Sequence, residues 1–207
     1  MSIVGTVHAN LVFGRRVRIL ADQLASLLPK TATVLDVGCG DGTLDSLILR
    51  SRPDLVINGI DVLVRPHTLI PVVPFDGNTI PYSNQAFDVV MFVDVLHHTD
   101  DPTVLLREAK RVARQAIVLK DHTKDGVLAG PTLRFMDWVG NRHHGVVLPY
   151  NYWTHDQWER ALIDLGLGIS AWNANVGLYP WPASHVFDRA LHFVAKLTPG
   201  AQFLRAA

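Results

Sequence analysis

The chain has 207 residues, 48% hydrophobic and 18% charged, which is the composition of an ordinary globular protein rather than a disordered one. Lysine plus arginine and aspartate plus glutamate both number 19, so no charge excess favours nucleic acid or an anionic membrane as a partner. No apolar run reaches the ~18 residues of a membrane span, and the N-terminus lacks the order of a secretory signal. One cysteine, Cys39, excludes an internal disulfide. These features predict a single cytoplasmic domain over 1–207, as a monomer or homodimer.

The predicted elements alternate between helices and strands along the chain. The first is a helix within about 1–30, whose apolar residues recur at helical spacing before Pro29. Strands are expected at 33–37, 54–61, 71–75, 87–95 and 115–121, and two more at 169–175 and 191–197. Helices are expected at 42–50, at 100–114 and from about 156. This alternation predicts a doubly wound parallel sheet that binds ligands at the carboxyl ends of its strands.

A glycine-rich turn, VLDVGCGDGTL at 34–44, follows the first of these strands. Its glycines, Gly38, Gly40 and Gly42, permit positive φ and a close approach of ligand to backbone. A dinucleotide-binding turn would be G-x-G-x-x-G, but Thr43 stands where its third glycine would be. Asp36 adds negative charge where a pyrophosphate would approach. The turn therefore favours a ligand with a cationic group over NAD.

Two further acids follow later strands. Asp61 ends the second strand, nineteen residues beyond Gly42, where a carboxylate can accept both hydroxyls of a ribose. Asp76 follows the third strand and could accept from the amino group of an adenine. A helix cap is the alternative for Asp61, and an Asp-Gly turn is the alternative for Asp76.

Together, the glycine turn, the segments GID and VLKDH, and FDGNTIPYSNQAFDVVMFVDVLHHTDDPTVLLREAKRVA resemble the class I methyltransferases that use S-adenosylmethionine. The resemblance covers about 30–122 and is nearest to small-molecule methyltransferases. It implies a Rossmann-like seven-stranded sheet in the order 3-2-1-4-5-7-6, with the seventh strand antiparallel. It also implies that the cofactor is held at Asp36, Gly38, Gly40, Asp61, Asp76, Gly77 and Asp94.

The segment between Asp61 and Asp76 departs from the family pattern. It has only fourteen residues, part of which must form the third strand. A parallel crossover normally takes a dozen or more residues including a helix, so the second crossover helix is expected to be reduced or lost. The residue that covers adenine is therefore left open among Val62, Leu63 and Arg65.

Methyl transfer needs few special side chains, because the sulfonium methyl is already activated. A general base is needed only for a protonated acceptor. The candidates are His122, which follows the fifth strand, and His143 and His144 in the next segment. His98 is expected beside cofactor or substrate. The histidine pairs lack metal-ligand spacing, and Asp121-His122 replaces the Asp-Asn pair of metal-dependent catechol methyltransferases, so no catalytic metal is predicted.

The region at about 126–166 is predicted to form a small lid that sets the substrate. Its aromatic and polar residues suit an organic molecule, and the expected substrate contacts are His98, Tyr150, Tyr152 and Trp153. The alternative is that its tryptophans only pack the lid onto the sheet. The predicted function is methyl transfer to O, N or C of a small molecule. Competing hypotheses are a nicotinamide-dependent oxidoreductase, a non-catalytic cofactor-binding protein, and an enzyme that uses the cofactor for another reaction.

Overall fold

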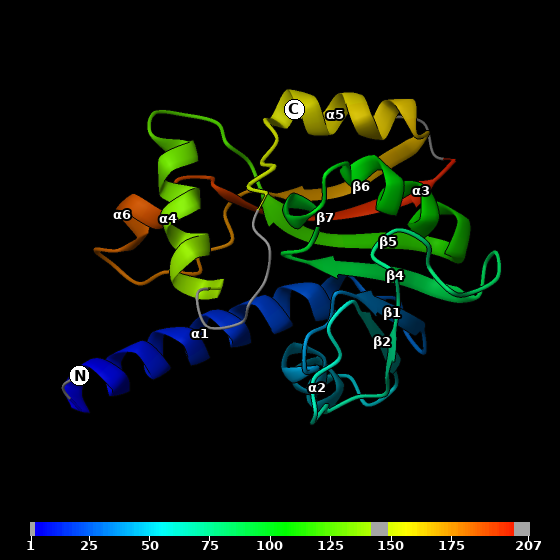
Figure 1. The fold of residues 1–207 in the computed structure, drawn as a ribbon, viewed down its shortest axis with the longest axis horizontal. Helices are drawn as coiled ribbons and strands as arrows, with labels where there is room; N and C mark the ends of the chain where they lie inside the picture. The colour runs from blue at the N-terminus through cyan, green and yellow to red at the C-terminus, as the bar shows by residue number, and fades with distance from the viewer. Residues whose placement is uncertain (1–2, 142–148, 201–207) are drawn as a thin grey trace.

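A twisted seven-stranded sheet forms the centre of the protein, in the order β3-β2-β1-β4-β5-β7-β6 (Figure 1). The computed structural model describes residues 3–141 and 149–200. Strands β1 to β5 pair in parallel, whereas β7 is antiparallel to both β5 and β6, so the predicted order and direction are confirmed. The strands are β1 (Thr33–Val37), β2 (Val56–Asp61), β3 (Val72–Pro74), β4 (Phe87–Val93), β5 (Ala113–His122), β6 (Leu167–Asn173) and β7 (His192–Pro199).

Helices cover both faces of the sheet, because the central strands carry apolar side chains on both faces. One face is covered by α1 (Ile3–Leu27) and α2 (Thr43–Ser51), and the other by α3 (Pro102–Val112) and α5 (His155–Asp164). Helices α4 (Ala129–Asn141) and α6 (Ser184–Phe187) lie instead beyond the strand tips, at the left of Figure 1. The short 3-10 helix η1 (Leu96–His98) follows β4 at the same end.

The connection from β2 to β3 contains no helix, as predicted from its length. Residues 62–71 run as turns and irregular backbone before Val72 pairs with Gly59. Ile70 packs against the glycine turn, because a Cβ at Gly42 would meet its side chain at 2.6 Å. Val62 and Leu69 are mostly exposed. The reduced crossover therefore leaves β3 as a three-residue edge strand, which pairs only with the last three residues of β2.

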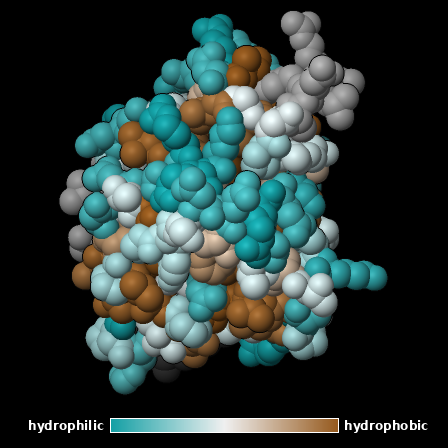
Figure 2. Space-filling view, turned by 90° about the vertical axis from the view of Figure 1, so that its right-hand side faces the viewer, coloured by the Kyte–Doolittle hydropathy of each residue, from teal (hydrophilic) through white to brown (hydrophobic). Residues whose placement is uncertain are grey.

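The opposite end of the sheet, where the strands begin, is a charged surface. Ion pairs there join Arg114 to Asp88 at 3.0 Å and Arg111 to Glu108 at 2.6 Å. Figure 2 shows that end, with hydrophilic residues across its middle and apolar ones mainly below. Surface pairs of this kind contribute at most about 1 kcal/mol each to stability. Among the described residues, no helix has the length and hydropathy to cross a bilayer.

Candidate cofactor and acceptor site

Two cavities lie beside the carboxyl end of β4. The larger, about 440 Å³, opens between the glycine turn, the end of β3 and the start of α3. The smaller, about 190 Å³, is closed by α1 and shares the end of β4. The larger is lined by Gly38, Val62, Phe75, Asp76, Gly77, Asn78, Val95, His98, Thr99, Asp100, Asp101, Val104, Leu105 and Pro149. The smaller is lined by Arg16, Val17, Leu20, Leu44, Val93, Asp94 and Leu178.

The glycine turn adopts the conformation for which the sequence selects glycine. Gly38, Gly40 and Gly42 all have positive φ, at 78°, 62° and 76°. A Cβ on Gly38 would lie only 2.5 Å from Val95 Cγ2, whereas one on Gly40 would meet nothing within 4 Å. The Gly38 amide donates to the carbonyl of Ile60 at 2.7 Å, which fixes the turn against β2. Gly38 is thus required both by its backbone conformation and by close packing beside the larger cavity.

Asp61 connects the glycine turn to the carboxyl end of β2. Its Oδ2 accepts from the Gly40 amide at 2.8 Å, and its Oδ1 accepts from the Leu63 amide at 2.8 Å. Each carboxylate oxygen has a second lone pair. The carboxylate is therefore oriented by backbone and still has capacity for two further donors, such as two hydroxyls.

Asp36 is almost fully buried beside a second buried acid, Asp45 of α2. Burial is the main reason that the pKa of Asp36 lies well above its usual value, and the charge of Asp45 raises it further. Burial also raises the pKa of Asp45 to about 6. Neither acid is among the residues lining the two cavities. The predicted contact between Asp36 and a cationic ligand stays a prediction.

We expect this acid pair to make the protein less stable as the pH rises from about 4 to 7. The folded-state pKa of Asp45 exceeds its ordinary value of 3.8, so the folded state loses stability as this proton dissociates. A shift of this size corresponds to on the order of 3 kcal/mol. Asp45→Asn should remove most of that decline in chemical denaturation at pH 4 to 8. Asp41→Asn, in the exposed part of the turn, removes only a minor charge that raises the pKa of Asp45, so it should retain most of the decline. An equal decline in both variants would contradict the assignment.

The residues predicted to lie beside adenine gather at the larger cavity. Val62, Asp76 and Gly77 all line it, together with Phe75. Asp76 Oδ1 accepts from the amides of Asn78 and Thr79, at 2.8 and 2.7 Å. The Asp-Gly turn, which was the alternative role for Asp76, is therefore also formed. Leu63 and Arg65 are not among the lining residues. Of the three residues left open for covering the ring, only Val62 is placed at this cavity.

A buried lysine fixes the end of β4. The Lys120 side chain is fully buried, and its Nζ forms a short ion pair with Asp94 Oδ1. Asp94 has a φ of 57° at the first residue after the strand. Burial raises its pKa, but Lys120 and His97 outweigh this effect and leave it below its usual value. Asp94 is therefore an ionised carboxylate at the boundary between the smaller cavity and the network described next.

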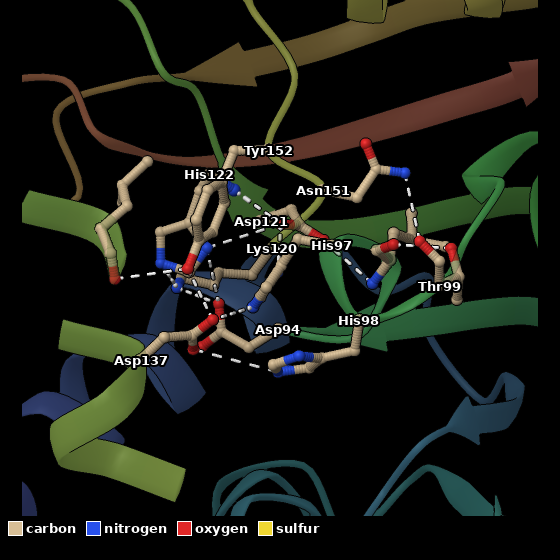
Figure 3. A network of polar contacts seen from close by, with 12 residues as sticks. Asp94, His97, His98, Thr99, Lys120, Asp121, His122, Asp137, Asn151 and Tyr152 are labelled. Atoms are coloured by element: carbon tan, nitrogen blue, oxygen red, sulfur yellow. Dashed lines mark hydrogen bonds and ion pairs between the residues drawn. The ribbon is translucent and has the colours of Figure 1, made fainter. Parts of the chain in front are cut away.

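A network of histidines and aspartates links the ends of β4 and β5 (Figure 3). His97 Nδ1 lies 2.7 Å from Asp121 Oδ1, and both side chains are about 1% exposed. Burial lowers the pKa of His97, but Asp121 and Asp137 reverse this and raise it to about 10. The ring of His122 packs edge-on against His97 at 4.7 Å. Burial and Lys120 hold the pKa of His122 well below its usual value, so His122 is a neutral imidazole.

Asp137 connects this network to α4. Its Oδ2 accepts a 2.5 Å hydrogen bond from the Tyr152 hydroxyl and lies 3.5 Å from His97 Nε2. Its Oδ1 lies 3.9 Å from Nε2 of His98, which lines the larger cavity. The Tyr152 ring stacks on His97 at 5.2 Å. Helix α4 is thus joined to η1 by side chains of which one, His98, lines the larger cavity.

The residues predicted to contact substrate do not all lie together in the structure. His98 and Tyr152 belong to the network, and Tyr150 lies beside Tyr152 at a ring distance of 6.4 Å. Trp153 instead packs on Trp158 and lines a groove between α3 and α5. The predicted base His122 is in the network, whereas the predicted bases His143 and His144 lie outside the described residues.

The family model for the methyltransferase domain matches residues 12–170. The chain belongs to this methyltransferase family. Its cofactor is S-adenosylmethionine, as the sequence predicted. The larger cavity fits the adenosine part of that cofactor, since Val62, Phe75 and Val95 offer apolar walls and Asp76 a hydrogen-bond acceptor.

Two curated methyltransferases show sequence similarity to this one. The 27-O-demethylrifamycin SV methyltransferase of Amycolatopsis mediterranei is 29% identical over 46% of this chain and 40% of its own. The ubiquinone biosynthesis O-methyltransferase of Pseudomonas paraeruginosa is 32% identical over 45% of this chain and 44% of its own. The matched region therefore spans less than half of either relative.

Among solved structures, a putative methyltransferase in complex with the Haloferax volcanii Trm112 activator has a TM-score of 0.67. That protein is 16% identical, and the match covers 90% of this chain and 91% of the other. At 16% identity, the similarity shows that the two proteins share a fold.

Sequence reasoning about this methyltransferase assigned no role to five residues of the site. His97, Lys120 and Asp121 were visible as polar residues at the ends of strands that are otherwise apolar. Asp137 and Arg16 gave no such signal, because each lies in a helix whose position over the strand ends follows only from tertiary packing.

Proposed function

We propose that the protein transfers the methyl group of S-adenosylmethionine to an oxygen atom of a small organic molecule. Both curated relatives are described as methyltransferases that act on oxygen. The observation that carries the proposal is geometric: the rings of His98 and His122 both pack on His97, and His98 lines the cofactor cavity. A hydroxyl acceptor must lose a proton to a nearby base, for which an imidazole is the most frequent group. A nitrogen or carbon acceptor is the alternative within the same reaction.

In this proposal the two cavities divide the cofactor between them. Val62, Phe75 and Asp76 hold adenine in the larger cavity, and Asp61 accepts from the ribose hydroxyls. Arg16 lines the smaller cavity, and its buried Nε has no hydrogen-bond partner among the described residues. Arg16 is placed to pair with the carboxylate of the methionine part. When bound, the cofactor supplies an activated methyl group, and the protein aligns it with the acceptor.

The acceptor is proposed to enter from the α4 side and to place its oxygen near His98 and His122. His122 Nδ1 faces Asp94 Oδ1 and Asp121 Oδ1, each at 3.5 Å, and its Nε2 lies 3.5 Å from Lys120 Nζ. An ammonium group can only donate, so Nδ1 carries the hydrogen of the neutral ring and Nε2 is the nitrogen proposed to take the proton. His143 and His144 remain proposed alternatives for this role.

Methyl transfer can be tested by incubating the protein with S-adenosylmethionine labelled in its methyl group and a metabolite library. Label in a small hydroxylated product would support the proposal. Label only in protein or nucleic acid would overturn the small-molecule assignment. Binding of S-adenosylhomocysteine without any labelled product would favour the alternatives of a non-catalytic protein or another cofactor-dependent reaction.

Tyr152→Phe should slow turnover while it leaves affinity for S-adenosylhomocysteine within a few-fold of wild type. The substitution keeps the ring stacked on His97 but removes the hydrogen bond that orients Asp137. A hydrogen bond to a charged group contributes about 1.5–3 kcal/mol, so a tenfold or greater fall in kcat is expected if it acts in the transition state. Steady-state kinetics and cofactor titration measure the two effects. An unchanged kcat would remove Tyr152 from the acceptor site.

A further inference from the structure

Three side chains from two different elements converge beside the acceptor end of the larger cavity. They are His97 and His98 of η1 and Asp137 of α4. One ligand atom from each lies within 4.8 Å of the other two. We propose that these three residues bind a divalent transition-metal ion such as zinc, with an open coordination position toward the cavity that His98 lines.

The donor set is the one that such ions prefer. Two imidazole nitrogens and one carboxylate, with a position left for water or substrate, form a recurrent catalytic zinc or iron(II) arrangement. His97 Nε2 and His98 Nε2 lie 3.5 and 3.9 Å from the two Asp137 oxygens. Bonds of about 2.0–2.2 Å to one ion require donors roughly 3.0–3.6 Å apart. All three donor atoms lie within 4.8 Å of one another, so the widest pair needs to close by at most about 1–2 Å.

Supporting contacts around the three residues strengthen the assignment. His97 Nε2 is buried and has no hydrogen-bond partner among the described atoms, whereas its Nδ1 is held by Asp121 at 2.7 Å. A carboxylate on the far nitrogen is the usual way in which a metal-binding histidine is oriented. The Tyr152 hydroxyl plays the corresponding role for Asp137.

Negative charge also gathers around the proposed ligands. Asp121 Oδ1 lies 2.7 Å from His97 Nδ1, and Asp137 Oδ2 lies 3.5 Å from His97 Nε2. Two carboxylates thus face one buried imidazole, and such surroundings favour a cation.

A neighbouring set of possible ligands, Asp94, His97 and His122, shares one histidine with this site. Lys120 Nζ already pairs with Asp94 and lies 3.5 Å from His122, so a second cation there would be repelled. We therefore assign the ion to His97, His98 and Asp137. The sequence predicted no catalytic metal because the histidine pairs lack metal-ligand spacing and Asp121-His122 replaces an Asp-Asn pair. The structure adds Asp137, thirty-nine residues beyond His98.

The consequence for catalysis rests on the proposed function. An ion at this place could hold the acceptor oxygen and lower the pKa of its hydroxyl, as metal ions do for bound water. Binding of the ion itself does not depend on the reaction, so it can be tested separately.

The test uses the full chain, freed of metal with EDTA, and equilibrium dialysis against Zn²⁺ with elemental analysis. We expect one zinc per chain, and Co²⁺ in its place should give the visible absorption of a site with nitrogen and oxygen ligands. His98→Gln and Asp137→Asn should each weaken binding at least tenfold, since even outer partners of metal ligands are worth 10- to 100-fold in affinity. His155→Gln, a partly exposed histidine paired with Glu159 on α5, is the matched control and should bind like wild type.

No zinc at one equivalent, or equal binding by wild type and the two ligand variants, would overturn the site. Circular dichroism and thermal unfolding check that each variant is folded; if Asp137→Asn is not, His98→Gln at the cavity edge decides. Titration with S-adenosylhomocysteine in EDTA tests the cofactor site independently. Cofactor binding without zinc binding would reject the metal site and leave the proposed function standing.

Discussion

Asp61→Ala should raise the dissociation constant for S-adenosylhomocysteine by tenfold or more while the protein remains folded. The carboxylate is only 9% exposed and is oriented by the amides of Gly40 and Leu63. If it accepts from both ribose hydroxyls, each charge-assisted bond contributes at most about 1.5–3 kcal/mol. The structure adds a second reason for a large effect, because the variant also leaves the Gly40 amide without its acceptor beside the cavity.

These two contributions can be separated with a second variant and a control. Asp61→Asn retains an oxygen that can accept from one backbone amide, so it should preserve the turn better than alanine while it still loses affinity. Asp41→Ala changes an exposed acid of the same turn and should leave the constant within about twofold of wild type. Isothermal titration provides all three constants. An unchanged constant in Asp61→Ala would place the ribose elsewhere.

The fold was predictable because its signals are local. The buried β-branched strands, the Asp101 cap with Pro102 at the start of α3, and the glycine turn each depend on a few neighbouring residues. The short crossover was predictable from chain length alone, since the fourteen residues between Asp61 and Asp76 must also contain the third strand and leave too few for a helix.

The candidate site was predictable only where a strand end presents a residue directly. Asp61, Asp76 and His122 follow strands and were found in this way. The pairing of Asp36 with Asp45 was not, because it depends on how α2 packs against β1. Likewise, Asp137 meets His97 only because α4 lies beyond the strand tips (Figure 3). Burial then changes the chemistry: Asp36, expected as a negative charge for a cationic ligand, has a pKa raised well above its usual value.

Gly38→Ala should destabilise the protein and weaken cofactor binding more than the same change at Gly40. Both residues have positive φ, so alanine at either costs about 1–2 kcal/mol of conformational strain. Only at Gly38 does the new Cβ meet an obstacle, Val95 Cγ2 at 2.5 Å. Overpacking of this kind costs typically about 1–3 kcal/mol more. Gly40→Ala is therefore a matched control that isolates the strain.

The collision at Gly38 should also reach the cofactor, because Val95 lines the larger cavity and must move when the Cβ is added. The double variant Gly38→Ala, Val95→Ala removes the obstacle but not the strain. Its unfolding free energy, measured by chemical denaturation, should recover to within about 1 kcal/mol of the Gly40→Ala value, allowing for the lost valine methyl groups. Equal stability of Gly38→Ala and Gly40→Ala would mean that Val95 yields freely. The close packing between the glycine turn and the end of β4 would then not be what makes glycine necessary at position 38.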